Sequence, residues 1–356
     1  MKKAIKIFLR SLCVVLLTVV MILLFLLGGM WIIARGPSPA AGRLFALSVR
    51  ETSAVGFLAN IYFSDEELAS FYDEVEITDK TDSSLIQIPN NNHGEDTSGS
   101  QGELPPGYEG PAGNPADKDE NGGIEIVDIK GGSYLGKMMI VKDPSRLVVG
   151  TPDSFGASSK GLSVKQMIKK YGAVAGINAG GFADEGGNGT GGIPDGIVIV
   201  DGKVLWDHGN NGTTYSLVGF DANNILHVGR MTAAQAVKAG ITDAVCFGPS
   251  LIINGKPTNS SKPLGGGLNP RTAIGQRADG AVLLLVINGR QMDSLGATYD
   301  DLIDIMLEFG AVNASNLDGG SSSIMIYNDE YLTNSAYIFG ERVIATSFLV
   351  MPEVVE

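Results

Sequence analysis

The chain has 356 residues, a formal net charge of −13, 48 glycines and two cysteines. This length fits one domain with appendages or two domains, and the frequent glycines favour a turn-rich all-β or α+β core over a helical bundle. The acidic balance argues against binding to nucleic acid or docking on anionic lipid. Cys13 and Cys246 lie in segments of different character, so the chain has no disulfide framework.

The N-terminal segment has the composition of a membrane anchor. Residues 1–11 form a basic tail without acids, and residues 12–33 contain no charge. A spanning helix needs about 20 apolar residues, so this run is long enough. The flanking cations place the N-terminus in the cytoplasm and the rest outside. Because a cleaved signal peptide has an apolar region of only about 7–15 residues, we predict an uncleaved single-pass signal anchor.

Two segments of different composition follow the anchor. Residues 34–72 contain regularly spaced apolar side chains, and Ser64 followed by three acids is typical of a helix start. We therefore predict a helical stalk near the membrane. Residues 73–122 are rich in Asp, Glu, Gly, Pro, Asn and Ser, which predicts a disordered acidic linker.

Residues 123–356 alternate short apolar runs with turn residues, which is typical of a β-rich domain. Ser163–Gln166 and Thr232–Gln235 are capping boxes that predict helix starts, and Thr298–Glu308 carries the strongest helical pattern. The expected strands include Ile124–Ile129, Met138–Val141, Leu147–Val149, Ala173–Asn178, Ile197–Val200, Val204–Trp206, Tyr215–Phe220, Ile225–Val228, Leu251–Ile253, Thr272–Gln276, Ala281–Ile287, Asn313–Asp318 and Arg342–Val350. We predict a single α+β domain with a few packed helices.

A polar turn near the C-terminus is the first candidate for chemistry, because it follows one apolar strand and precedes another. Glycines let a ligand approach the main chain closely, and backbone N–H groups beside serine hydroxyls suit an anionic or sugar ligand. The alternative interpretation is an ordinary hairpin turn. The turn contains Asp318, Gly319, Gly320, Ser321 and Ser322.

Two further strand ends carry polar residues. Asn178 precedes Gly180 and Gly181, and its amide both donates and accepts hydrogen bonds, which suits sugar hydroxyls. Arg271 enters a strand directly after a proline, a position suited to a bidentate grip on phosphate. The alternatives are a strand-end turn at Asn178 and a surface arginine paired with an acid at Arg271.

The glycine-rich segment from Asp184 to Asp195 predicts a loop over a site. Asp184, Glu185, Asn188 and Asp195 are ligand types for a hard cation such as Ca²⁺, but their spacing is not that of an EF-hand. We favour a solvated lid and expect no cofactor and no metal site, with Ca²⁺ as the open alternative. The candidates for acid–base work among the three histidines are His208 and His227.

Taken together, these segments resemble the phosphodiester glycosidase family. No single motif is specific, whereas all of them in this order over residues 123–356 are. Ala183 and Ser321 stand where the family often has a second aromatic residue and a third glycine, and both departures concern substrate fit more than the reaction. The motifs are Ile177–Phe182, Pro194–Gly196, Gly248–Leu251, Asn269–Ala273, Asn288–Gln291 and Asn316–Ser322.

The resemblance implies a hydrolase acting on a sugar joined through its anomeric carbon to phosphate. Most glycosidases need an acid to protonate the leaving oxygen as well as a carboxylate at the ring. Because phosphate leaves as a stable anion, an arginine that holds it can replace the acid. We therefore expect Arg271 on the phosphate and Asp318 at the anomeric carbon, as nucleophile or as base toward water. The remaining expected contacts are sugar hydroxyls held by Asn178 and Asp195, and a ligand lying close to the backbone of Gly180, Gly181, Gly319 and Gly320.

The expected substrate is a phosphorylated glycan, either a cell-envelope polymer or an exopolysaccharide at a bacterial surface. The competing hypothesis is a non-catalytic module that binds envelope glycan, since the same residues would serve either role. A third hypothesis is metal-dependent hydrolysis through the loop between Asp184 and Asp195.

Overall fold

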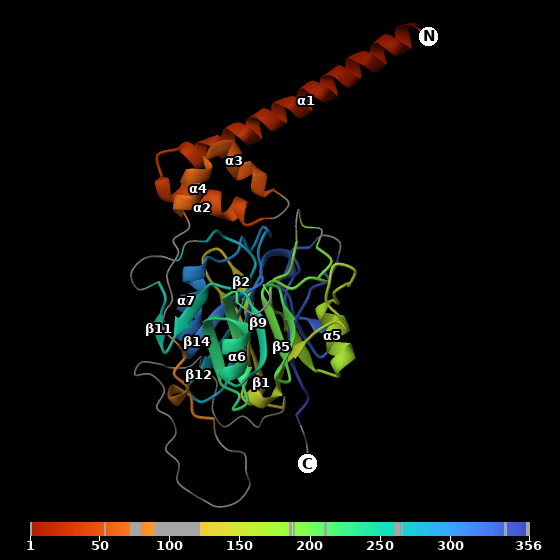
Figure 1. Cartoon of the computed structure of the whole chain (residues 1–356). Helices are drawn as coiled ribbons and strands as arrows, with labels where there is room; N and C mark the ends of the chain where they lie inside the picture. The colour runs from red at the N-terminus through yellow and green to blue at the C-terminus, as the bar shows by residue number, and fades with distance from the viewer. Residues whose placement is uncertain are drawn as a thin grey trace, which may run out of the picture. The chain divides into compact units, whose positions relative to one another are not determined.

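The computed structural model (Figure 1) describes residues 2–52, 55–71, 80–88, 122–184, 187, 189–209, 212–259, 264, 266–337 and 340–353. The chain forms two compact units, Met1–Tyr72 and Asp73–Glu356. The part of the predicted linker at residues 89–121 lies outside the described residues.

The first unit is helical, as predicted. The long helix α1 (Lys2–Arg35) precedes α2 (Pro39–Arg50), α3 (Ala59–Tyr62) and α4 (Asp65–Phe71). The stretch Ile5–Arg35 is long and apolar enough to cross a membrane, a property that N-terminal signal sequences share. Ser64 and Glu67 form the reciprocal hydrogen bonds of a capping box at the start of α4.

The predicted stalk is a small packed unit around the end of α1. Tyr62, Phe63 and Leu68 are buried together with alanines of α1, α2 and α3. The Arg35 guanidinium donates to both carboxylate oxygens of Glu67, at 2.7 and 2.8 Å, and lies over the Phe63 ring. This bidentate contact ties α4 to the end of α1.

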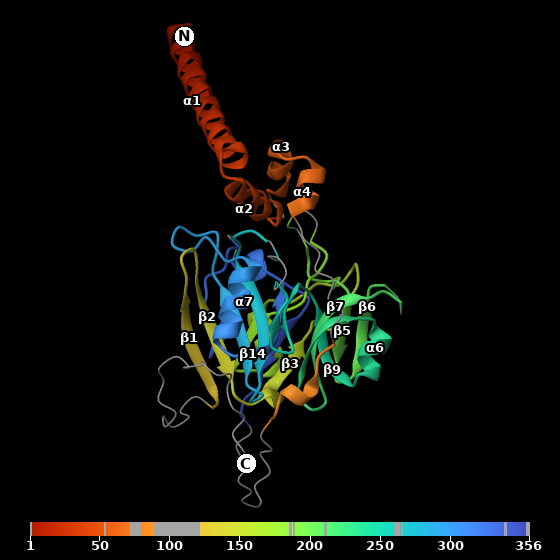
Figure 2. The ribbon, with the colours of Figure 1, turned by 90° about the vertical axis from the view of Figure 1, so that its left-hand side faces the viewer.

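The second unit contains three antiparallel sheets in its described part (Figure 1, Figure 2). The first sheet runs β1 (Ile124–Lys130), β2 (Leu135–Val141), β13 (Val282–Ile287), β12 (Arg271–Arg277), β14 (Ala311–Leu317), β10 (Ser250–Ile253), β11 (Lys256–Pro257). The second runs β16 (Glu330–Tyr331), β15 (Met325–Tyr327), β4 (Ala175–Asn178), β17 (Ser347–Val350), β3 (Leu147–Gly150). The third runs β6 (Lys203–Asp207), β5 (Ile197–Val200), β9 (Ile241–Cys246), β7 (Tyr215–Asp221), β8 (Leu226–Met231).

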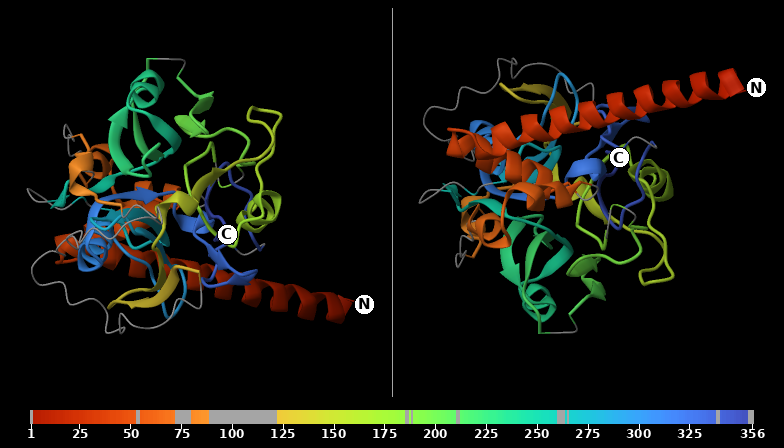
Figure 3. Two further views of the ribbon diagram at one scale, coloured as in Figure 1. Left: turned by 90° about the horizontal axis from the view of Figure 1, so that it is seen from below. Right: turned by 90° about the horizontal axis from the view of Figure 1, so that it is seen from above.

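The three sheets share one central core, and each carries a helix on its outer face (Figure 3). Inward side chains of all three sheets, such as Leu317, Phe348 and Val245, are fully buried together. Helix α7 (Tyr299–Glu308) packs on the first sheet, α5 (Val164–Tyr171) on the second and α6 (Ala233–Lys238) on the third. The predicted capping boxes at Ser163 and Thr232 are present, and Thr298 with Asp301 forms a third that was not predicted. The α+β prediction is therefore confirmed.

Three connections between sheets start where β4, β9 and β14 end. The polar turn at Asp318 joins β14 of the first sheet to β15 of the second, so it is a crossover and not a hairpin. The N–H of Asp318 donates to the carbonyl of Ala179, and the N–H of Gly181 donates to the carbonyl of Cys246. The ends of the three strands are thus joined by main-chain hydrogen bonds at one place.

Two boundaries differ from the prediction. The closing strand β17 begins at Ser347, so Arg342 lies in a preceding loop. Residues 80–88, predicted as disordered linker, are bound to the domain. Asn254 accepts from the N–H of Asp82 and donates to the carbonyl of Lys80, and Ile86 is only 5% exposed. Composition did not predict this contact, because the partners of residues 80–88 lie far away in the sequence.

Ile86 should therefore contribute to the stability of the second unit. Ile86→Ala is expected to lower the free energy of unfolding by about 2 kcal/mol, because it removes buried methyl groups. Leu85 is 42% exposed, so Leu85→Ala should change it by less than about 0.5 kcal/mol. Urea denaturation of the two variants measures the difference. Equal effects would show that residues 80–88 do not form part of the folded unit.

Candidate active site

Asn178 is the residue that holds the Asp318 turn in place. Its side chain is fully buried, and its Nδ2 donates to the carbonyl oxygen of Asp318 at 2.5 Å. Its Oδ1 accepts from the Thr272 hydroxyl at 2.8 Å and from the N–H of Ile324 at 3.1 Å. One amide therefore joins β4, β12 and both ends of the crossover. The predicted role of Asn178 on sugar hydroxyls is wrong for this geometry, because its oxygen and amide group already bind the protein.

The Asp318 carboxyl has an unusual protonation equilibrium. Burial raises its pKa to about 7, against hydrogen bonds from Ser322 and Gly319 and the positive charge of Arg342, all of which lower it. Desolvation disfavours the charged form of a carboxyl group, and here it outweighs the local donors. A carboxyl group that titrates near neutrality can serve as a base or a nucleophile, and such shifts concentrate at functional sites.

Arg342 is a cation of this site, and no pattern in the sequence predicted it. Its side chain is only 9% exposed and forms an ion pair with Asp184. Its Nη1 donates to the Ser321 hydroxyl at 2.8 Å, and its guanidinium lies over the Phe182 ring. These contacts fix the positive charge beside the Asp318 turn. No local motif marks Arg342, because its partners lie far away in the sequence.

Arg271 does not point into this site. Thr272 binds Asn178, and successive side chains of a strand alternate between faces, so Arg271 points to the opposite face of β12. There its guanidinium stacks 4.1 Å from the centre of the Tyr299 ring and donates to the carbonyls of Ala297 and Gly267. The side chain is 5% exposed. The predicted grip of Arg271 on phosphate has no support in this geometry, and Arg342 is the guanidinium that binds Ser321 of the Asp318 turn.

The paired glycines allow close packing within the protein. A Cβ on Gly180 would lie 3.0 Å from Val245, and one on Gly181 would lie 2.8 Å from the Phe247 ring. A Cβ on Gly319 would lie 2.9 Å from the carbonyl of Pro270, and Gly320 has a φ of +60°. The predicted approach of a ligand to these backbones stays a prediction. The structure supplies a reason for glycine without a ligand, since a side chain would collide with neighbouring strand ends.

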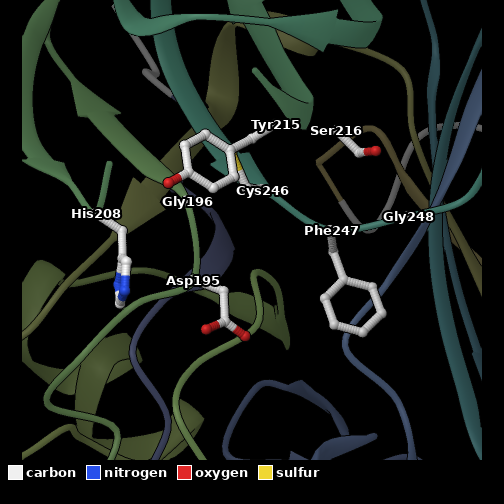
Figure 4. A pocket seen from close by; sticks show the side chains of 8 residues that line it. All are labelled: Asp195, Gly196, His208, Tyr215, Ser216, Cys246, Phe247 and Gly248. Carbon is white, nitrogen blue, oxygen red and sulfur yellow. The ribbon is translucent and has the colours of Figure 1, made fainter. Parts of the chain in front are cut away.

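An open pocket of about 360 Å³ lies next to these strand ends (Figure 4). Asp195, His208, Tyr215 and Phe247 line it, and the carboxylate of Asp195 is held near Gly181. Partial burial raises the pKa of Asp195, while His208 lowers it and Asp184 raises it. Asp195 and the candidate His208 therefore line a ligand-sized space, and the contact of Asp195 with sugar hydroxyls stays a prediction.

The other candidates are not placed for chemistry. His227 Nε2 forms a hydrogen bond with Asp221 Oδ2 at 3.0 Å within the β7–β8 hairpin. Burial raises the pKa of the Cys246 thiol to about 12, which leaves it inert. Glu185 and Asn188, two of the suggested Ca²⁺ ligands, lie outside the described residues. Among the residues that are described, no three His, Cys, Asp or Glu side chains gather as a metal site would require.

Comparison with known proteins identifies the family. The model of the phosphodiester glycosidase family matches residues 171–351, and the chain belongs to this family. The catalytic domain of zebrafish N-acetylglucosamine-1-phosphodiester alpha-N-acetylglucosaminidase has the same fold, with a TM-score of 0.52 at 20% identity over 64% of this chain and 82% of that one. The predicted resemblance to the phosphodiester glycosidase family is therefore confirmed.

A curated relative is less informative about function. The SPbeta prophage-derived uncharacterized protein YomE of Bacillus subtilis is 30% identical over 210 residues, which is 57% of this chain. The matched region is 32% of YomE, so this chain spans about a third of that protein.

The raised pKa of Asp318 predicts a pH-dependent stability. The group stabilises the fold below pH 3.8, and this contribution is lost as the pH rises through about 7. Ionised Asp318 should thus destabilise the fold at pH 8 by at most about 4 kcal/mol. Asp318→Asn is expected to melt at a higher temperature than the wild type at pH 8, with a smaller gap at pH 5. A less stable variant at pH 8 would show that the site favours the ionised carboxylate.

Proposed function

We propose that the second unit hydrolyses the bond between the anomeric carbon of a sugar and the oxygen of a phosphodiester. The observation that carries this proposal is a half-buried carboxyl group, Asp318, beside a fixed guanidinium, Arg342, at the junction of three sheets. A glycosyl phosphate needs a carboxylate at carbon and a cation at phosphate, and these two groups supply them.

In this proposal the ionised Asp318 carboxylate faces the anomeric carbon. It either attacks that carbon or takes a proton from an attacking water molecule. The bond from the anomeric carbon to oxygen breaks, its electron pair leaves with the phosphate monoester, and water supplies the new hydroxyl of the sugar. No acid has to protonate the leaving oxygen, because the phosphate ester departs as a stable anion stabilised by Arg342.

Arg342 is suited to the phosphate because a guanidinium has five N–H donors. Its contacts with Asp184 and Ser321 engage one Nη atom each. A phosphate oxygen pair would accept two parallel N–H bonds from the guanidinium, the geometry that arginine favours. The Phe182 ring beneath the guanidinium keeps its plane fixed.

The cellular setting is part of the proposal. Helix α1 would anchor the chain, with its C-terminal domain outside the membrane. The substrate would then be a sugar-1-phosphodiester in a glycan of a bacterial envelope or in an exopolysaccharide. The zebrafish protein of the same fold is named for action on N-acetylglucosamine-1-phosphodiesters, which supports this bond type.

The full chain, purified in detergent, should release free sugar from α-linked sugar-1-phosphodiesters. Because the carboxylate must be ionised, kcat/KM is expected to rise with pH through about 7 and to level off above pH 8. Asp318→Asn should lose at least about 100-fold in kcat. Near-normal turnover by this variant, or binding of phosphorylated glycans without release from any substrate, would contradict the proposal and favour a glycan-binding module.

The two arginines offer a matched comparison. Arg342→Gln should raise KM for phosphodiesters about 10- to 100-fold, the equivalent of one charge-assisted contact, and should shift the rising limb of the pH profile upward. Arg271→Gln should change KM less than about 3-fold but lower the free energy of unfolding by about 1–3 kcal/mol, because it leaves buried carbonyls unpaired. The opposite pattern would restore Arg271 to the phosphate.

A further inference from the structure

We propose that the pocket lined by Asp195, His208, Tyr215 and Phe247 is the subsite for the sugar ring, and that it selects uncharged sugars over acidic ones. This inference deepens the proposed function, because it rests on Asp318 as the reacting group. It assigns a chemical class to the sugar, which the proposed reaction alone leaves open.

The pocket lies within reach of Asp318 through one short segment. The N–H of Asp318 donates to the carbonyl of Ala179 at 2.9 Å, and the N–H of Asp195 donates to the carbonyl of Gly181 at 2.9 Å. Two residues of chain span at most about 7 Å. The main chains of Asp318 and Asp195 are therefore bonded to neighbouring residues of the segment Ala179–Gly181. A sugar ring in the pocket would place its anomeric carbon toward Asp318.

The pocket walls combine aromatic rings with polar groups. Figure 4 shows the Asp195 carboxylate between the rings of His208 and Phe247, with Tyr215 at another side. A sugar presents apolar C–H faces and polar hydroxyl edges, so it matches a wall of this mixed kind. The volume of about 360 Å³ is near the lower end for small-molecule sites, which suits one sugar unit rather than a long glycan.

The charges around the pocket differ from those beside Arg342, so the sugar and the phosphate of the substrate would meet different environments. Of the described residues that line it, none is a lysine or an arginine, and Asp195 is the carboxylate at its wall. Asp184 acts electrostatically on both Asp195 and Asp318. A uronic or sialic acid would bring its own carboxylate against Asp195, and like charges at close range repel. The phosphate, by contrast, lies on the side of Arg342.

His208 both packs against Trp206 and lines the pocket. Its ring meets the edge of Trp206 with centroids 6.2 Å apart, and Trp206 Nε1 donates to the carbonyl of Pro194 at 2.9 Å. Pro194 precedes Asp195, so the same hydrogen bond steadies both polar groups of the wall. Together they offer a carboxylate acceptor and an imidazole to neighbouring hydroxyls.

Saturation-transfer difference NMR on the full chain tests this inference without requiring turnover. The protein is kept in a detergent without a sugar headgroup. The probes are glucose, galactose, mannose and N-acetylglucosamine, with glucuronic and galacturonic acid as acidic counterparts. At least one neutral sugar should show saturation transfer, and each uronic acid should show at least about 5-fold less than its neutral counterpart. Binding of a uronic acid as strong as that of its counterpart, or of no sugar at all, would overturn the inference.

Three variants connect the signal to the pocket. Phe247→Ala should weaken saturation transfer to the neutral sugar at least about 3-fold. Asp195→Asn removes the carboxylate from the pocket wall and should raise the signal of the uronic acid relative to its neutral counterpart. Asp128→Asn is the matched control on β1, where the side chain is 83% exposed, and should change neither. An unchanged ratio in Asp195→Asn would refute charge selection.

The outcomes separate this inference from the proposed function. Neutral sugars that bind through Phe247 without any hydrolysis of sugar-1-phosphodiesters would uphold the subsite and refute the reaction. Hydrolysis that is insensitive to Phe247→Ala and Asp195→Asn would uphold the reaction and refute the subsite.

Discussion

The Asn178 side chain is the contact on which the arrangement of the candidate site depends. Its amide joins β4 to β12 and to both ends of the crossover that carries Asp318. Because it is fully buried and replaces water with protein partners, any shift of one strand end would leave a polar group unpaired, at a cost of about 1–3 kcal/mol. The first and second sheets thus fix the main chain at Asp318 to within the tolerance of a hydrogen bond.

This rigidity has an energetic consequence for Asp318. The site holds the carboxyl group where burial raises its pKa to about 7, so the ionised form that the proposed reaction needs is unfavourable for folding. Arg342 partly offsets this cost, and its contacts with Asp184 and Ser321 keep it from moving away. The same cation then serves the phosphate. Ionisation of Asp318 therefore lowers the stability of the fold while it allows the proposed reaction. The charge of Arg342 reduces this loss of stability.

Local signals in the sequence predicted the local features. The capping boxes at Ser163 and Thr232, the strand before Asp318 and the glycines after it were recognisable because each depends on neighbouring residues. The face of β12 on which Arg271 lies could not be predicted. This strand is buried on both sides, so its sequence shows no alternation of apolar and polar residues that would assign each side chain to a face. Arg342 and the bound segment at Ile86 depend on partners far away in the sequence, which composition and spacing do not reveal.

The position of bond cleavage tests the central claim most directly. The full chain would hydrolyse a sugar-1-phosphodiester in H₂¹⁸O, and mass spectrometry would locate the label in the products. A carboxylate acting at the anomeric carbon requires that the new oxygen enter the sugar, so the phosphate monoester should stay unlabelled. Label in the phosphate would mean attack at phosphorus, and Asp318 would then not be the group that faces the anomeric carbon.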